Sequence, residues 1–160
     1  MADVKPADHP PIGQMAPDFT LMREDGSAVT LSALRGSRVV LFTYGADGTP
    51  SCTNEIMEFQ ALLPEFQAAG VTVLGLSKDG VEKHRKFAAK QGLGMALLSD
   101  KEGHVMEDWG SYGAKIFFGK EVVGVLRSTF LIGADGVLEK TWRVEKVKGH
   151  AAEVLTAVKG

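Results

Sequence analysis

Apolar runs and helical spacings divide the chain into short strands and helices. Runs rich in β-branched and aromatic side chains, bounded by glycine and polar turn residues, predict strands. The predicted strands are residues 18–23, 28–31, 38–43, 71–77, 96–99, 126–132 and 137–144. The predicted helices run from 50 to about 70, from 79 to 91 and from Gly149 or His150 to Val158, with one or two further turns within 101–109.

Two turns and one crossover determine how these elements join. Residues 24–27 (EDGS) and 133–136 (GADG) have the composition of hairpin turns. The strand at 71–77 is almost wholly apolar, as expected for a strand covered on both faces, and it follows the preceding strand through a helix. This βαβ unit predicts parallel strands with a right-handed crossover. Pro64 should bend or break the intervening helix, and Gly70 should end it.

The order of the elements predicts the fold class. A βαβ unit, a connecting helix, a β-hairpin and a closing helix follow one another as in a thioredoxin-like α/β fold, in which α-helices flank a mixed central β-sheet. The first hairpin adds an N-terminal extension. With 44% apolar residues, a chain of 160 residues can bury one core. We expect one domain over residues 1–160, with the Pro-rich residues 1–13 as a surface arm.

Composition argues against several classes of protein. The net charge is −2, and no basic patch argues for nucleic acid. No apolar run approaches the roughly 20 residues of a membrane helix, and the N-terminus lacks the apolar core of a signal peptide, so a cytoplasmic, reducing location is expected. The four histidines show no pair at ligand spacing, so neither a metal site nor a cofactor is predicted. They are His9, His84, His104 and His150.

The single cysteine, Cys52, stands where a strand is followed by a helix. Thr49 and Pro50 form a helix start, with a hydroxyl to cap free N–H groups and a proline at the first helical position. In the turn that follows, unpaired N–H groups and the helix dipole favour a thiolate. The apolar stripe of the helix begins after the cysteine, which predicts a thiol at the exposed helix tip. The stripe consists of Ile56, Phe59, Leu63 and Phe66.

The number of thiols limits the redox chemistry. One cysteine forbids an intramolecular disulfide. The positions three residues before and after it hold Thr49 and Glu55, so the chain lacks the cysteine pair of a dithiol oxidoreductase. A free cysteine is also commonly a small buried hydrophobe, and a structural module with an inert cysteine is therefore one alternative.

Six segments together resemble the thiol peroxidases called peroxiredoxins, and more narrowly their bacterioferritin comigratory protein (BCP), or PrxQ, branch. The central segments are TPSCTNE at 49–55 and RSTFLIGADG at 127–136. The order and spacing of the segments make the resemblance specific, and it covers nearly the whole chain. It implies a hydroperoxide reductase of the thioredoxin-dependent type. The other four segments are APDFTL at 16–21, VLGLSKD at 73–79, KFAAKQG at 86–92 and LLSD at 97–100.

The resemblance implies catalytic roles for three residues. Cys52, as a thiolate, would attack the terminal oxygen of a hydroperoxide and become a sulfenic acid. Thr49 would direct its hydroxyl to the sulfur and the peroxide, and Arg127 would bring a fixed positive charge to the same point. The implied supporting residues are Glu55, which would hold the arginine, Pro50 and Ser51.

Each of these residues also has a simpler interpretation. Thr49 alone would be a helix cap, and Arg127 an ordinary strand-edge arginine. Glu55 would be a solvated acid that suits the helix dipole. Three aromatic residues either line a pocket near the site or belong to the core. They are Trp109, Phe117 and Phe118.

The sequence departs from the family in two respects. Gly45 stands where the family usually has a proline packed over the sulfur, so the loop is less restricted and the sulfur less shielded. Met57 and Ala88 occupy the usual positions of a resolving cysteine. The resemblance therefore implies a one-cysteine (1-Cys) peroxidase whose sulfenic acid is reduced by an external thiol such as glutathione, thioredoxin or glutaredoxin, or through an intermolecular disulfide. Such a protein would serve antioxidant defence and cell redox homeostasis, and this branch is commonly monomeric.

One alternative comes from another functional class. A non-enzymatic redox sensor or holdase with a thioredoxin fold would carry a cysteine that reacts slowly with peroxide. Gly45 and the missing resolving thiol favour that alternative, whereas Thr49, Cys52 and Arg127 favour the peroxidase.

Overall fold

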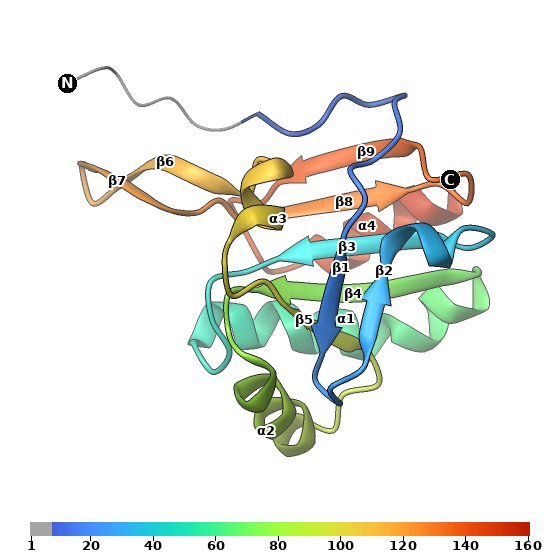
Figure 1. Ribbon diagram of the computed structural model, residues 1–160, viewed down its shortest axis with the longest axis horizontal. Helices are drawn as coiled ribbons and strands as arrows, with labels where there is room; N and C mark the ends of the chain where they lie inside the picture. The colour runs from blue at the N-terminus through green and yellow to red at the C-terminus, as the bar shows by residue number, and fades with distance from the viewer. Residues whose placement is uncertain (1–7) are drawn as a thin grey trace.

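A seven-stranded mixed β-sheet forms the centre of the protein, which a computed structural model describes over residues 8–160 (Figure 1). Its strands are β1 (Thr20–Arg23), β2 (Ala28–Thr30), β3 (Arg38–Thr43), β4 (Val71–Ser77), β5 (Ala96–Ser99), β8 (Ser128–Ile132) and β9 (Leu138–Arg143). A separate two-stranded sheet contains β6 (Tyr112–Phe117) and β7 (Lys120–Val125). The helices are α1 (Pro50–Ala68), α2 (Val81–Gln91), α3 (His104–Asp108) and α4 (His150–Lys159), with a 3₁₀ turn at Leu31–Leu34.

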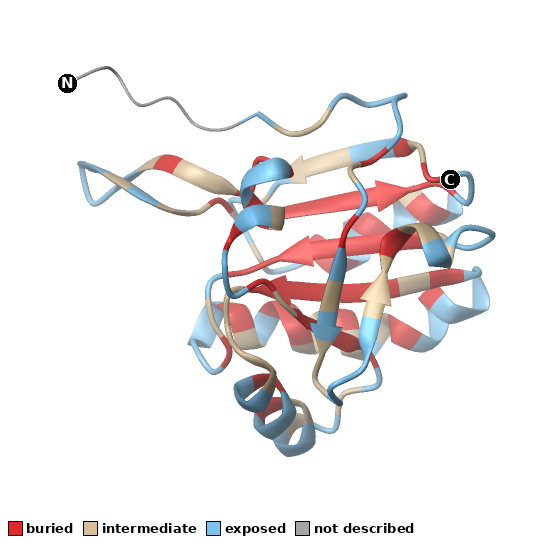
Figure 2. Cartoon of the chain, in the orientation of Figure 1, coloured by how far each residue is buried: buried red, intermediate tan, exposed pale blue. Residues whose placement is uncertain are grey.

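The strand order confirms the predicted thioredoxin-like α/β class. The sheet runs β2-β1-β5-β4-β3-β8-β9, with β3, β4 and β5 parallel and the other pairs antiparallel. The predicted βαβ unit is therefore present, and so is the hairpin of β8 and β9. The parallel strands β3 and β4 and the adjacent β8 are the most buried, as apolar strands with cover on both faces should be (Figure 2).

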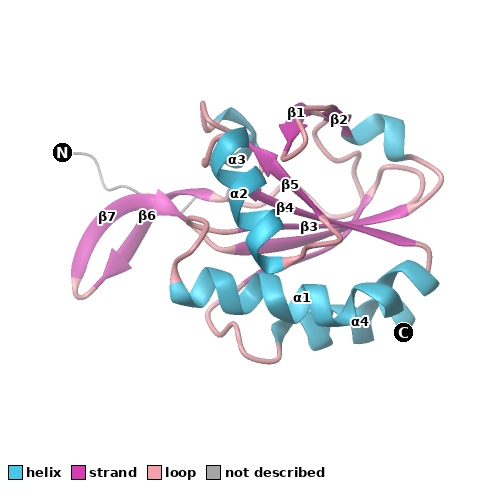
Figure 3. Cartoon of the chain, turned by 90° about the horizontal axis from the view of Figure 1, so that it is seen from below, coloured by secondary structure: helices cyan, strands magenta, loops and turns pink. Residues whose placement is uncertain are grey.

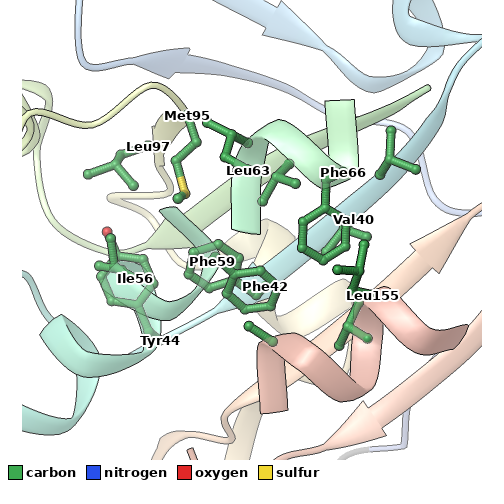
Figure 4. Packing of buried hydrophobic residues seen from close by; sticks show 14 of the residues in the cluster. Val40, Phe42, Tyr44, Ile56, Phe59, Leu63, Phe66, Met95, Leu97 and Leu155 are labelled. Atoms are coloured by element: carbon green, nitrogen blue, oxygen red, sulfur yellow. The ribbon is translucent and has the colours of Figure 1, made fainter. Parts of the chain in front are cut away.

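Helices and the N-terminal hairpin cover opposite faces of the sheet. Helices α1 and α4 lie together on one face (Figure 3). There Phe42 of β3 stacks on Phe59 of α1 with ring centroids 4.4 Å apart, at the centre of the aromatic cluster in Figure 4. The other face packs against α3, Trp109 and residues of the N-terminal hairpin such as Phe19 and Leu31.

The predicted N-terminal hairpin forms with shorter strands than expected. It crosses in front of the main strands and joins the sheet where β1 pairs with β5 (Figure 1). The predicted surface arm of residues 1–13 lies partly outside the described residues. Within the described part, His9 is half-buried, with its Nε2 3.0 Å from Ser128 Oγ and its ring against Phe130.

The course of helix α1 differs from the prediction that Pro64 would bend or break it. It runs through Pro64 without a break and ends at Ala68, and Gly70 follows in the left-handed conformation with φ +77°. Pro64 lies on the exposed side of the helix, where water can reach the carbonyl that loses its N–H donor. The buried face of the helix keeps its packing, so the proline does not interrupt it.

The sequence prediction missed the β6–β7 hairpin. Its two-residue turn is Phe118-Gly119, with φ values of +51° and +77°, which suit a tight turn between twisted strands. A Phe-Gly pair is a weaker turn signal than Asn-Gly, which explains the omission. In both Figure 1 and Figure 3 the hairpin projects from the end of the molecule where α1 begins. Among residues 8–160, no helix has the length and apolarity that crossing a bilayer would require.

The packing predicts that two phenylalanines contribute very differently to the free energy of unfolding. Phe59 is fully buried in the core, whereas Phe118 at the hairpin tip is 91% exposed. We expect Phe59→Ala to lower the free energy of unfolding by about 3–5 kcal/mol, because it leaves a cavity among aromatic side chains. Phe118→Ala is the matched control and should change it by less than about 0.5 kcal/mol. Urea unfolding followed by circular dichroism measures both, and equal losses would contradict the assigned packing.

Candidate active site

Strand pairing brings together the two sequence segments that carry the candidate residues. Helix α1 starts beyond the carboxyl end of β3, and β8 runs antiparallel to β3 with Thr43 opposite Ser128. The residue before β8, Arg127, therefore lies beside the start of α1. This antiparallel register is the reason that residues some 75 positions apart in the sequence meet.

Cys52 lies in the first turn of α1, but its side chain is only 3% exposed. The expectation of an exposed helix tip is therefore wrong. Cys52 belongs to the buried cluster that includes Tyr44 and Ile56, because the loop after β3 folds back over the sulfur. The buried stripe of α1 thus begins at the cysteine and not after it.

The hydroxyl of Thr49 does not cap the helix. Thr49 is the N-cap residue by backbone position, but its Oγ1 donates to the carbonyl of Ala46 at 3.0 Å. The same hydroxyl is near enough to Cys52 to act on its ionisation. Because a hydroxyl has one proton that rotates, it can turn from the carbonyl toward the sulfur when the thiolate forms.

The surroundings of Cys52 favour its thiolate on balance. Burial opposes ionisation, but the hydroxyl of Thr49, the backbone of Ala46 and the charge of Arg127 outweigh it, so the pKa of Cys52 is lowered from its ordinary value. One guanidinium nitrogen of Arg127, Nη2, lies 3.3 Å from Cys52 Sγ.

Arg127 is held by two residues of α1. Its Nη1 donates to Glu55 Oε1 at 2.5 Å, and its Nη2 also donates to Ser51 Oγ at 3.1 Å. Glu55 is 1% exposed, so it is not the solvated acid of the simpler interpretation. Pro50 occupies the first helical position, as expected, where the N–H group that proline lacks would have no partner within the helix.

The two charges of this pair affect one another strongly. Burial raises the pKa of Glu55 from 4.5 to about 7, against the opposing charge of Arg127. In the described part of the chain its second oxygen, Oε2, has no hydrogen-bond partner, which accounts for the cost of charging it. Burial lowers the pKa of Arg127, but Glu55 and Cys52 outweigh it and raise that pKa above its ordinary value.

Neither usual position of a resolving cysteine holds a sulfur that can form a disulfide. Met57 is half-buried on α1, and Ala88 packs from α2 against the same core as Cys52. Cys52 is the single cysteine of the chain and is free.

A buried network that sequence reasoning missed fixes the loop before α1. Asp47 accepts hydrogen bonds from Tyr44 Oη at 2.6 Å and lies 2.6 Å from His84 Nδ1. Its backbone N–H donates to Asp79 Oδ2 at 2.7 Å. His84 is fully buried, and its Nε2 lies 2.9 Å from the carbonyl of Leu98. The loop is thereby bound to the segment that follows β4 and to α2.

The same network gathers three groups of the kind that bind metals. Ligand atoms of Asp47, Asp79 and His84 lie within 4.8 Å of one another, although the spacing in sequence gave no sign of it. Protein donors already occupy these oxygens, including Ser77 Oγ and Lys83 Nζ on Asp79. The cluster therefore serves as a set of hydrogen bonds that supports the loop.

A cavity of about 540 Å³ opens beside the candidate site. Gly45 and Arg127 form one side of it, and the β6–β7 hairpin forms another. Of the three aromatic residues considered from sequence, Phe117 lines this cavity, Trp109 is fully buried in the core, and Phe118 points into solvent.

Comparison with known proteins establishes the family. Residues 12–141 match the model of the AhpC/TSA family. The chain belongs to this family. It is also 42% identical over 147 residues to a putative peroxiredoxin bcp of Helicobacter pylori strain J99, covering 92% of this chain and 97% of that one. It is 43% identical over 148 residues to the peroxiredoxin Bcp of Bacillus subtilis, covering 92% and 94%.

Solved structures of the BCP/PrxQ branch share the fold. The Xanthomonas campestris bacterioferritin comigratory protein, described for its alkyl peroxide reduction activity, superposes with a TM-score of 0.84 at 41% identity, covering 88% of this chain and 90% of that one. A PrxQ cysteine mutant from Xylella fastidiosa superposes with a TM-score of 0.88 at 37% identity, covering 95% and 97%. This peroxiredoxin is therefore an enzyme of the thiol peroxidase class, which takes a peroxide as substrate and a thiol as reductant.

The geometry predicts how Arg127 affects the thiol of this peroxiredoxin. We expect Arg127→Ala to raise the pKa of Cys52, because the positive charge 3.3 Å from the sulfur is lost. The pH profile of iodoacetamide alkylation should move to higher pH. Arg35→Ala, directly after the 3₁₀ turn and with its guanidinium against Met15, is the control and should leave the profile in place. An unchanged profile for Arg127→Ala would remove this arginine from the site.

The raised pKa of Glu55 predicts that the free energy of unfolding depends on pH. Its folded-state pKa of about 7 exceeds the ordinary value of 4.5, so the folded protein holds this proton more tightly than the unfolded chain. This proton stabilises the folded state fully at low pH, and the stabilisation is lost as the pH rises through about 7. Its size is on the order of 3 kcal/mol. We therefore expect the wild type to lose unfolding free energy relative to Glu55→Gln between pH 5 and pH 8. A difference that is independent of pH would show that Glu55 does not titrate in this range.

Proposed function

We propose that this peroxiredoxin is a 1-Cys peroxidase that reduces hydrogen peroxide and organic hydroperoxides through Cys52. The contact of the Arg127 guanidinium with the sulfur, at 3.3 Å and backed by Glu55, carries the proposal. A fixed positive charge at this point stabilises both the thiolate and the charge that develops as the O–O bond breaks. The alkyl peroxide reduction described for the Xanthomonas campestris relative supports organic hydroperoxides as substrates.

In the proposed reaction the Cys52 thiolate attacks the terminal peroxide oxygen. A sulfur–oxygen bond forms, the O–O bond breaks, and the leaving oxygen takes a proton to depart as water or alcohol. The peroxide is reduced, and the sulfur is oxidised to a sulfenic acid. Thr49 would turn its hydroxyl from the Ala46 carbonyl toward the sulfur and the peroxide, while Arg127 holds the oxygens in line with the sulfur.

We further propose that the sulfenic acid returns to the thiol at the expense of an external thiol. With Met57 and Ala88 in the usual resolving positions, the chain offers no second sulfur for an internal disulfide. Glutathione, thioredoxin or glutaredoxin would attack the sulfenic sulfur, and a second thiol would release Cys52. A disulfide between two chains is the other route.

Four further proposals concern the whole protein. It acts as a single domain over residues 1–160 and as a monomer, in keeping with the commonly monomeric branch that it resembles. It works in a reducing, cytoplasmic compartment, since its turnover needs external thiols. Antioxidant defence and redox homeostasis are the roles that follow from this chemistry.

The decisive experiment measures oxidation of pre-reduced protein by hydrogen peroxide and by cumene hydroperoxide. We expect second-order rates several powers of ten above that of free cysteine, and one equivalent of sulfenic acid trapped by dimedone and identified by mass spectrometry. Cys52→Ser is the control and should not react. A rate equal to that of free cysteine would overturn the proposal and favour the redox sensor or holdase.

The proposed role of Thr49 predicts a contrast between two variants. Thr49→Ser keeps the hydroxyl and should retain most of kcat/KM for peroxide. Thr49→Val keeps the shape and removes the hydroxyl, so it should lose roughly 100-fold or more, as is typical when one stabilising donor is deleted. Stopped-flow oxidation of each variant provides the measurement. Equal rates would mean that Thr49 only shapes the helix start.

A further inference from the structure

One peptide group of the loop before α1 is held at both of its ends. It joins Ala46 to Asp47, so it carries the carbonyl of Ala46 and the N–H of Asp47. The N–H donates to Asp79 Oδ2 at 2.7 Å, and the carbonyl accepts from Thr49 Oγ1 at 3.0 Å. Because a trans peptide group is planar, its N–H and its C=O point in opposite directions. The direction in which Asp79 holds the N–H therefore sets the direction of the carbonyl that meets Thr49.

Asp79 is itself fixed to the central sheet. It lies between β4 and α2, and its side chain is 11% exposed. Ser77 Oγ, on the last residue of β4, donates to its carboxylate at 2.9 Å and accepts from its backbone N–H at 3.1 Å. Ser99 Oγ, on the last residue of β5, donates to its backbone carbonyl at 2.6 Å. The ends of two central strands thus hold the residue that holds the loop.

The carboxylate of Asp79 is a charged acceptor. Burial raises its pKa, but hydrogen bonds from Lys83, the Asp47 N–H and Ser77 outweigh burial and keep the pKa below its ordinary value. A hydrogen bond to an ionised carboxylate is stronger and shorter than one to a neutral acceptor, in keeping with the distance of 2.7 Å. The exposed Lys83 binds the other oxygen, Oδ1, and so does not compete with the loop for Oδ2.

The anchored peptide lies beside the reacting sulfur. A Cβ atom at Gly45, the residue before Ala46, would lie 3.8 Å from Cys52 Sγ. The Oγ1 of Thr49 can occupy three staggered positions about its χ1 bond, and the bond to the Ala46 carbonyl selects one of them. Rotation of the peptide would remove this acceptor and free the hydroxyl to take another position.

The side-chain network of Asp47 does not prevent such a rotation. Its bonds to Tyr44 and His84 hold the side chain and hence the Cα atom. The peptide before that Cα can still turn about the bonds that flank it, and the neighbouring Gly45 adds little restriction. Within the described part of the chain, the N–H end of this peptide bonds to Asp79.

We infer that Asp79 is a positioning residue for the peroxidase reaction, on which it acts through the Ala46–Asp47 peptide and Thr49. Asp79 fixes the peptide, and the carbonyl of the peptide places the Thr49 hydroxyl beside the sulfur. The hydroxyl is then in place before a peroxide arrives, which is the preorganisation that a stabilising group needs. This inference rests on the proposed function, because it requires that the Thr49 hydroxyl acts in peroxide reduction.

The test compares two variants of Asp79 that both lack its charge. Asp79→Ala removes the acceptor oxygen, whereas Asp79→Asn keeps an oxygen that the Asp47 N–H can reach. Oxidation of each pre-reduced protein by hydrogen peroxide is measured by stopped flow, and dimedone trapping confirms the sulfenic acid. The second-order rate should fall by about tenfold or more in Asp79→Ala, because the hydroxyl is misplaced, and by less than about threefold in Asp79→Asn.

The chain offers a matched control in the turn between β8 and β9. There Asp135 Oδ1 accepts the backbone N–H of Val137 at 3.0 Å, at the end of β8 away from Arg127. Asp135→Ala removes the same kind of bond and should leave the rate within about twofold of wild type. Circular dichroism and urea unfolding establish that each variant is folded. If Asp79→Ala does not fold, Asp79→Ser takes its place, since its hydroxyl can pair with Ser77 but is too short for the Asp47 N–H.

A double-mutant cycle separates positioning from a general loosening of the site. Thr49→Val has no hydroxyl to position, so adding Asp79→Ala to it should lower the rate by less than about twofold. A general loosening would instead lower the rates of wild type and Thr49→Val by the same factor.

The outcomes distinguish this inference from the proposed function. If wild-type protein reacts no faster than free cysteine, the peroxidase proposal itself fails. If Thr49→Val is slow but folded Asp79→Ala reacts like wild type, the inference is overturned and the peroxidase stands. Equal losses in Asp79→Ala and Asp79→Asn, or equal effects of Asp79→Ala with and without the Thr49 hydroxyl, would likewise overturn it.

Discussion

The ion pair between Arg127 and Glu55 is the interaction on which the site depends. The guanidinium bridges two residues of α1 and the sulfur of Cys52, so it links the start of the helix to the segment before β8. Without the Arg127 guanidinium, a charged carboxylate at Glu55, which is 1% exposed, would carry a large desolvation free energy. The pair therefore gives the sulfur a positive charge of fixed direction, and it does so inside a core that would otherwise suppress the thiolate.

The loop before α1 owes its position to side chains and not to a proline. Asp47 connects it to Tyr44 and to the buried His84, and its backbone is bonded to Asp79. This matters because Gly45 leaves the backbone less restricted than the usual family proline would. The network therefore fixes the loop that the glycine leaves less restricted, and Cys52 beside it is only 3% exposed.

Local pattern predicted most of the fold, and its failures have physical causes. The strands and the hairpin of β8 and β9 follow from apolar runs and turn composition, whereas the turn at Phe118 and Gly119 depends on backbone conformations that the residue types signal weakly. Pro64 shows a further limit, because a proline on a solvated face does not interrupt a helix whose other face is firmly packed. The placement of Cys52 failed for a related reason, since periodicity cannot show that a preceding loop folds back over a helix start.

The sequence by itself determined the order of elements, the single thiol at a helix start and the segments that mark a peroxiredoxin, because each of these is a property of neighbouring residues. The tertiary structure alone decided that Cys52 is buried, that Asp47 meets His84 and that a charged cavity lies under the β6–β7 hairpin. The contact of Asp47 with His84 joins residues 37 positions apart, and that of Arg127 with Cys52 joins residues 75 positions apart. Burial and ion pairing depend on distance in space, and only the packing of strands and helices sets that distance.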